Sequence, residues 1–366
     1  MHHTRRGVLR GLAAGGAAAV GGCLGGDTAS GDPNAVEPSQ RSSSTTAGET
    51  AAPPTADEPR HVAYDHASLR SNVVSGGVPK DGIPSINDPQ FASADDVDIP
   101  GGDPVFGVER GDDVRAYPQY ILVHHEIVND RIAGDPVAVT YCPLTGTAQG
   151  FERGETTFGV SGDLLNANLV MYDRGTDSRW PQMLATAIDG PLAGATLQEF
   201  RIVWTTWRAW RDEHPDTRVL TEDTGYVRSY GDDPYGSYNP RRRYYNNDVT
   251  FFDPLTEDDR LDPKVVVLGA RLADHAVAFD KQALLEDRVL ATEDAETPLV
   301  AVADPDLLTG YVYANPDERE VTAEDGGYAV GDETHEPAAL PLERVLAFDS
   351  MWFAWAGYYP ETSYVE

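Results

Sequence analysis

The sequence has 366 residues, of which 40% are hydrophobic, 9% aromatic and 24% charged. A chain of this length and composition can bury a sizeable core, as one large domain or two of ordinary size, and it is neither collagen-like nor mainly disordered. Its 28 basic and 60 acidic residues give a formal net charge of -32. Nucleic acid is therefore excluded as the principal partner, because it selects basic surfaces.

The cations are nearly all arginines, since Lys80, Lys264 and Lys281 are the only lysines. Lysine scarcity together with excess carboxylate is typical of a protein adapted to molar salt. At that salt concentration the Debye length falls to about 3 Å, so repulsion between surface carboxylates is screened. We therefore interpret the acidity as a halophilic adaptation rather than as the mark of a cationic ligand.

Residues 1–22 are predicted to be a twin-arginine signal peptide. The motif Thr-Arg-Arg-Gly-Val-Leu-Arg at 4–10 precedes an apolar run at 11–22 that is too short to span a bilayer about 30 Å thick. Small residues then lead to Cys23, as in a lipobox. These features predict a lipoprotein that is anchored through lipid on Cys23 to the outer face of the cytoplasmic membrane, and so is extracytoplasmic.

Residues 23–60 are predicted to be a flexible tether. They are rich in Ser, Thr, Pro and Ala and contain no aromatic residue. Such a segment cannot bury enough apolar surface to offset its ordering entropy.

Beyond the tether, short β-rich segments alternate with turn signals such as Gly-Asp and Asn-Asp. Strands are predicted at 105–109, 114–117, 136–141, 156–160, 169–172 and 265–268, and helices near 204–213, 281–287 and 351–358. The predicted fold class is α+β, mainly β.

Two degenerate repeats are predicted, each ending in a Trp-x-Ala-Trp helix. Trp207-Arg-Ala-Trp210 with Pro-Asp-Thr at 215–217 has the spacing of Trp352-Phe-Ala-Trp355 with Pro-Glu-Thr at 360–362. Upstream, Gly107 is one of seven residues that recur 162 positions later. We expect a first repeat at 61–225, a Tyr/Arg-rich connection at 226–261 and a second, shorter repeat at 262–366.

The duplication helps to tell structural residues from functional ones. Residues kept in both copies are expected to be structural, whereas polar residues present in one copy only are candidates for function. His124-His125-Glu126 corresponds to Glu-Asp-Arg at 286–288, and Cys142 corresponds to Asp304. We expect His124 and His125 to begin a strand that continues through 126–130 and leads to a turn, so that the two histidines would face opposite sides. One of these histidines at most would then meet Cys142.

Three hypotheses for Cys142 remain open. A thiolate with His125 and Met171 would suit a soft metal such as copper, in a metal- or ligand-binding protein. Alternatively, His125 could lower the pKa of a nucleophilic Cys142 while Glu126 orients the imidazole, in a cysteine-dependent enzyme acting on an envelope substrate. In the third, the chain is a structural surface protein and Cys142 is a buried core residue.

The Tyr/Arg-rich connection contains six tyrosines at 226–245 and the run Arg241-Arg242-Arg243. These side chains could stack on sugars or bases. We favour a linker that packs between the repeats.

Several ordered motifs resemble those of domain-of-unknown-function family 3179, a group of secreted proteins. The resemblance is dense from 76 to 220 and implies no activity, since the family is named for lacking one. In many members a second cysteine follows Cys-Pro-Leu, whereas this chain has Thr145, so the resemblance implies no dithiol chemistry here. The motifs are Asp-Gly-Ile-Pro-Ser-Ile (81–86), Arg-Ala-Tyr-Pro (115–118), His-Glu-Ile-Val-Asn-Asp (125–130), Val-Thr-Tyr-Cys-Pro-Leu (139–144), Thr-Phe-Gly-Val-Ser-Gly (157–162), Asn-Leu-Val-Met-Tyr-Asp-Arg (168–174), Gly-Pro-Leu (190–192) and His-Pro-Asp-Thr (214–217).

Overall fold

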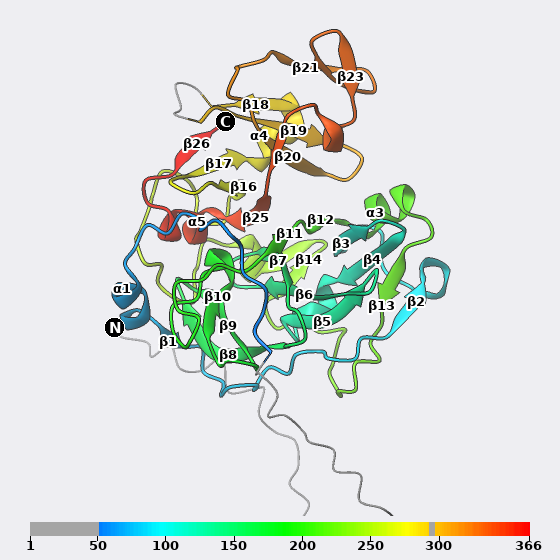
Figure 1. Ribbon diagram of the computed structural model, residues 1–366. Coiled ribbons are helices and arrows are strands. Elements are labelled where there is room, and N and C mark those ends of the chain that lie inside the picture. Colours follow the sequence, from blue (N-terminus) through cyan, green and yellow to red (C-terminus); the bar gives the residue numbers. More distant parts are fainter. Residues whose placement is uncertain (1–50, 293–296) are drawn as a thin grey trace, which may run out of the picture. The chain divides into compact units, whose positions relative to one another are not determined.

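The computed structural model describes residues 51–292 and 297–366, which belong to one compact unit (Figure 1). The predicted signal peptide, the lipidation site Cys23 and the tether up to residue 50 lie outside the described residues. Within the described part, no helix is both long and apolar enough to cross a membrane.

The last ten residues of the predicted tether, 51–60, lie against the folded unit. The backbone N–H of Ala56 donates to the carbonyl of Thr196 at 2.8 Å, and that of Gln198 donates to the carbonyl of Pro54 at 3.3 Å. The folded unit therefore begins before Arg60, because backbone hydrogen bonds hold a segment that has little apolar surface of its own.

The first repeat is built on three sheets, and its β-rich sequence forms mainly antiparallel hairpins. The five-stranded sheet has the order β12 (Val203–Thr206), β3 (Pro104–Arg110), β4 (Asp113–Pro118), β13 (Arg218–Leu220) and β2 (Phe91–Ser93). A four-stranded sheet has the order β11 (Glu199–Phe200), β7 (Thr147–Glu152), β6 (Asp135–Cys142) and β5 (Ile127–Ile132). The third has the order β1 (Val74–Ser75), β8 (Phe158–Leu165), β9 (Asn168–Asp173) and β10 (Arg179–Pro181).

The second repeat reproduces the first two of these sheets. One has the order β25 (Ala347–Met351), β16 (Val266–Arg271), β17 (Ala276–Asp280) and β26 (Ser363–Val365). The other has the order β18 (Val289–Ala291), β19 (Leu299–Asp304), β20 (Thr309–Ala314) and β24 (Glu343–Val345). A three-stranded sheet adds β21 (Val321–Glu324), β22 (Gly327–Val330) and β23 (Glu333–His335).

Strand direction and register confirm the predicted repeat. β13 runs parallel to β4 as β26 runs parallel to β17, while the other neighbours in the two sheets are antiparallel. Gly107 pairs with Ala116 in the first copy, and Gly269 pairs with Ala278 in the second. Both sheets can share one register because their alternating apolar residues face equivalent cores.

The short helices also match between the copies: α2 (Gln119–Leu122) with α4 (Lys281–Asp287), and α3 (Trp207–Glu213) with α5 (Trp352–Tyr358), while α1 (His66–Ser71) precedes the repeat. The indole N–H groups of Trp210 and Trp355 donate to Thr217 and Thr362, each at 3.0 Å. The helix predicted from 204 begins only at Trp207, because residues 203–206 form β12 and Thr206 caps the helix through the N–H of Ala209.

The two repeats share a core. The largest hydrophobic cluster contains β8 and β9 residues of the first copy together with all of α5 except Gly357. Asn166 donates to the carbonyl of Ala354 at 2.7 Å, and Tyr358 donates to that of Leu165 at 2.8 Å. Figure 1 shows the connection between the copies, which contains the hairpin of β14 (Gly236–Tyr238) and β15 (Arg241–Arg243).

Candidate functional site

The two histidines precede β5 in a turn, so the predicted placement of both on a strand is wrong. The N–H of Glu126 donates to the carbonyl of Leu122 at 2.7 Å, and Glu126 has a left-handed φ of 59°. Arg288 makes the same turn after α4, with a φ of 69° and a bond of 2.8 Å to Leu284. The left-handed residue is therefore part of the repeated scaffold, and only its side chain is particular to each copy.

The imidazole of His125 is held at both nitrogens. Its Nδ1 lies 2.7 Å from the carbonyl of Pro84, and its Nε2 lies 2.7 Å from the hydroxyl of Tyr230. A carbonyl only accepts, so Nδ1–H donates to Pro84 and Nε2 accepts from Tyr230. Burial is the main cause that lowers the pKa of His125 to about 4, and the ring is neutral at physiological pH.

Cys142 ends β6 and is almost fully buried. Its Sγ lies 3.9 Å from the carbonyl of Ala167. Burial and then the charge of Glu126 raise the pKa of the Cys142 thiol to about 11. Burial alone raises the pKa of Glu126 to about 8. Near neutral pH both groups are therefore mainly protonated and uncharged.

Met171 lies in the interior of β9, between Val160 of β8 and Trp180 of β10, and is fully buried. Among the described residues, no hydrogen bond or ring contact joins His125 to Cys142 or Met171, since each imidazole nitrogen already has another partner. No group of three or more His, Cys, Asp or Glu side chains in the described ranges is arranged to hold a metal ion. The copper site stays a prediction without structural support.

The environment of Cys142 differs from the one that a nucleophile requires. The enzyme hypothesis expects a lowered thiol pKa and a carboxylate that orients the imidazole. The pKa shift has the opposite sign, and Pro84 and Tyr230 rather than Glu126 orient His125. The physical reason is that desolvation of the buried sulfur outweighs the hydrogen bonds with Thr145 and Leu169, which favour the thiolate.

Native Cys142 is expected to react with iodoacetamide at pH 8 about a hundredfold more slowly than in the unfolded chain, because a pKa of about 11 in place of 9.0 lowers the thiolate fraction by that factor. Labelling is measured by mass spectrometry in a Cys23→Ser background. Equal rates in both states would identify Cys142 as an accessible nucleophile. The same shift makes stability depend on pH, because the unfolded chain loses the Cys142 proton more easily than the folded protein does. The contribution of the protonated Cys142 thiol to stability is therefore present below pH 9.0 and is lost as the pH rises towards 11.

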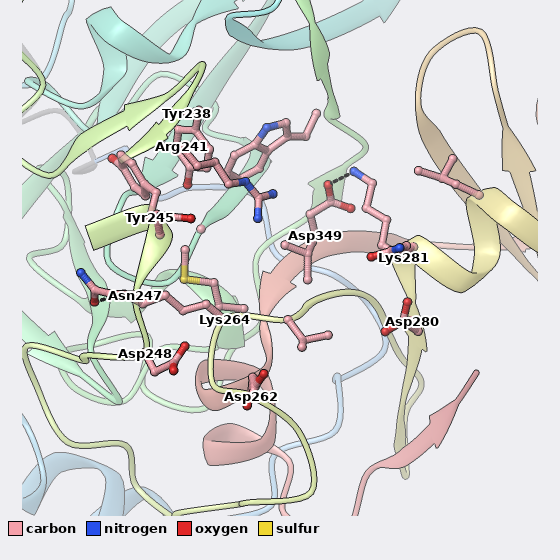
Figure 2. A pocket seen from close by; sticks show the side chains of 18 of the residues that line it. Tyr238, Arg241, Tyr245, Asn247, Asp248, Asp262, Lys264, Asp280, Lys281 and Asp349 are labelled. Carbon is pink, nitrogen blue, oxygen red and sulfur yellow. Dashed lines mark hydrogen bonds and ion pairs between the residues drawn. The ribbon is translucent and has the colours of Figure 1, made fainter. Parts of the chain in front are cut away.

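A cavity of about 730 Å³ lies where the connection meets both repeats (Figure 2). It is lined by Trp204 of β12, Tyr238 and Arg241 of the β14–β15 hairpin, Lys281 and Gln282 of α4, and Asp349 and Met351 of β25. The other lining residues are Gly146, Tyr245, Asn246, Asn247, Asp248, Asp262, Lys264, Val265, Val266, Asp280, Leu285 and Glu286. Cys142, His125 and Met171 do not line it.

A smaller cavity of about 320 Å³ occupies the equivalent place in the first repeat. Pro104, Gln119 and Tyr120 line it, and the residues 162 positions later, Val266, Lys281 and Gln282, line the larger cavity. Tyr238 contributes to both. Duplication has thus produced two corresponding hollows, and the larger one differs in its charged side chains.

Two of the three lysines line the larger cavity. Lys281 forms an ion pair with the buried Asp349, and the ammonium of Lys264 donates to the carbonyls of Tyr244 and Val249. Burial lowers the pKa of Lys264 to about 8. Lysine scarcity in the sequence indicates salt adaptation, and the same rarity marks two residues that line this cavity.

The comparisons with known proteins identify a family but no close relative of known role. No curated protein and no solved structure matched the chain. The family model described as "Protein of unknown function (DUF3179)" matches residues 80–362 and so covers most of both repeats. The chain therefore belongs to the DUF3179 family.

Proposed function

We propose that this protein binds a small polar ligand in the larger cavity. The main support for this proposal is the cavity of about 730 Å³, whose lining combines aromatic rings with charged side chains. Cavities of roughly 300–1,000 Å³ with a few convergent polar groups are typical ligand sites. The proposed binding role therefore lies where the connection meets both repeats, and not at Cys142.

The connection supports this assignment, because hydrogen bonds join it to both repeats. One side of the cavity is therefore already in place before a ligand binds. Tyr244 donates to the carbonyl of Leu144 at 2.6 Å, and Gln119 donates to Asp233 at 3.0 Å. Lys264 bonds the connection to the start of the second repeat. Packing between the repeats and lining a cavity are therefore compatible roles of one segment.

Gln282→Trp is expected to abolish ligand binding or weaken it by more than about tenfold, because the indole would occupy the cavity that the ligand needs. Gln282 is exposed on α4, so the fold should tolerate the change. The full chain is screened in high salt by thermal shift against sugars, amino acids, peptides and organic acids, and hits are titrated by calorimetry.

Tyr120→Trp is the matched control, since Tyr120 occupies the equivalent position at the smaller cavity. It should bind as the wild type does. A screen with no hit that depends on position 282 would refute the proposed binding site.

We further propose that this binding takes place outside the cytoplasm, on a lipoprotein anchored through Cys23. Support comes from the twin-arginine motif, the short apolar run and the lipobox-like residues before Cys23. Cys23→Ser is expected to move the protein from the membrane fraction to the soluble fraction of fractionated cells. Cys142→Ser changes the only other cysteine and should stay membrane-bound. Retention of the Cys23→Ser protein in membranes would contradict lipid anchoring.

A further inference from the structure

Most charged groups at the larger cavity already have partners. Lys281 is paired with Asp349, and the ammonium of Lys264 is held by backbone carbonyls and by Asn247. Asp280 accepts from the hydroxyl of Tyr364 at 2.9 Å, and Glu286 accepts from Gln282 at 2.8 Å. These groups shape the cavity, and each already has a hydrogen-bond or ion-pair partner without a ligand.

Three charged side chains differ from this pattern. Within the described part of the chain, neither an ion pair nor a hydrogen bond engages the guanidinium of Arg241 or the carboxylates of Asp248 and Asp262. All three line the cavity. Figure 2 shows Arg241 on one side, beside Tyr238, and Asp248 and Asp262 on the other. All three are solvent-exposed, and Asp248 interacts electrostatically with Lys264. The cavity therefore carries a positive side chain on one wall and carboxylates on the other, none of them in a direct ion pair or hydrogen bond with another described residue.

We infer, on the basis of the proposed binding function, that the ligand is a zwitterion of the amino-acid or short-peptide class. Its carboxylate would accept two parallel hydrogen bonds from Arg241, since a guanidinium matches a carboxylate in this geometry. Its ammonium would lie between Asp248 and Asp262. A purely anionic ligand fits less well, because the cavity lining has five carboxylates against three cations.

The aromatic residues beside Arg241 complete the site. Tyr238 pairs with Arg241 across the β14–β15 hairpin and stacks on Tyr245 with ring centroids 3.9 Å apart. Trp204 meets Tyr238 edge to face at 5.7 Å. Apolar side chains of a peptide pack well on such rings. The site thus offers separate contacts to the two charged ends and to the apolar body of the ligand.

The test is calorimetric titration of the full chain in molar salt with leucyl-alanine and with its acetylated, amidated form. We expect the free dipeptide to bind with a stoichiometry near one and the blocked form not to bind. Close ion pairs survive such salt better than long-range attraction does. Arg241→Gln should weaken binding by about ten- to a hundredfold, the usual range for losing hydrogen bonds between charged groups.

Arg242→Gln is the matched control, because Arg242 is the next residue of the same exposed strand and does not line the cavity. It should leave the affinity unchanged. Equal binding of free and blocked dipeptide, or an Arg241→Gln variant with wild-type affinity, would overturn the ligand class. If glucose binds instead and Gln282→Trp abolishes it, the binding function stands and the zwitterion inference fails. If no compound shows binding that depends on position 282, both fail.

Discussion

Glu199→Gln is expected to lower the free energy of unfolding by about 3–5 kcal/mol, the usual cost of leaving one partner of a buried ion pair without its countercharge. Glu199 of β11 and Arg271 of β16 form an ion pair between the two repeats, with side chains only 1% and 2% exposed. The variant would leave the Arg271 guanidinium charged in the interior. Urea unfolding at fixed salt, followed by tryptophan fluorescence, measures the loss.

Glu155→Gln provides the control. Its ion pair with Arg131 is exposed, at 71% and 50%, so its loss should cost less than about 1 kcal/mol. Replacing both buried partners, with Glu199→Leu and Arg271→Met, should restore much of the lost stability, since well-packed apolar residues avoid the desolvation penalty. A Glu199→Gln variant as stable as the Glu155→Gln variant would show that the pair does not hold the repeats together.

Gly107→Ala and Gly269→Ala are each expected to destabilise the fold by about 1–3 kcal/mol or more, through overpacking. A Cβ atom at Gly107 would lie 2.2 Å from the ring of Trp210, and one at Gly269 would lie 2.1 Å from the ring of Trp355. Neither ring can easily move away, because each indole N–H is bonded to a buried threonine. Both losses are read from urea unfolding curves.

Gly231→Ala is the matched control, since a Cβ there meets no atom within 4 Å. Similar losses at Gly107 and Gly269 would show that the duplicated glycine–tryptophan contact has kept one structural role in both copies. Tolerance of alanine at either position would show that this contact has relaxed in that copy.

The sequence was sufficient for the features that depend on local pattern. Most predicted strands lie within observed ones, as 105–109 lies within β3 and 169–172 within β9. The predicted helix at 281–287 coincides with α4. Apolar alternation and turn residues are encoded by neighbours in the chain, and the Trp-x-Ala-Trp spacing revealed the repeat because both copies meet the same packing requirement.

Local pattern failed at the two histidines, both for their backbone conformation and for the partner of His125. His124 and His125 precede an apolar run and so look like the start of a strand, but the chain turns there because Glu126 bonds back to Leu122. His125 then meets Tyr230, which lies 105 positions away in the sequence. No periodicity could have indicated that pairing.

Composition, export motif, duplication and family membership are thus properties that the sequence by itself determined or predicted. Only the tertiary structure decided that Cys142 is a buried, protonated thiol and that Arg241 shares a cavity with Asp262. The physical reason is that burial and electrostatic environment depend on which segments pack together. In this fold the cavity walls come from both repeats and from the connection between them.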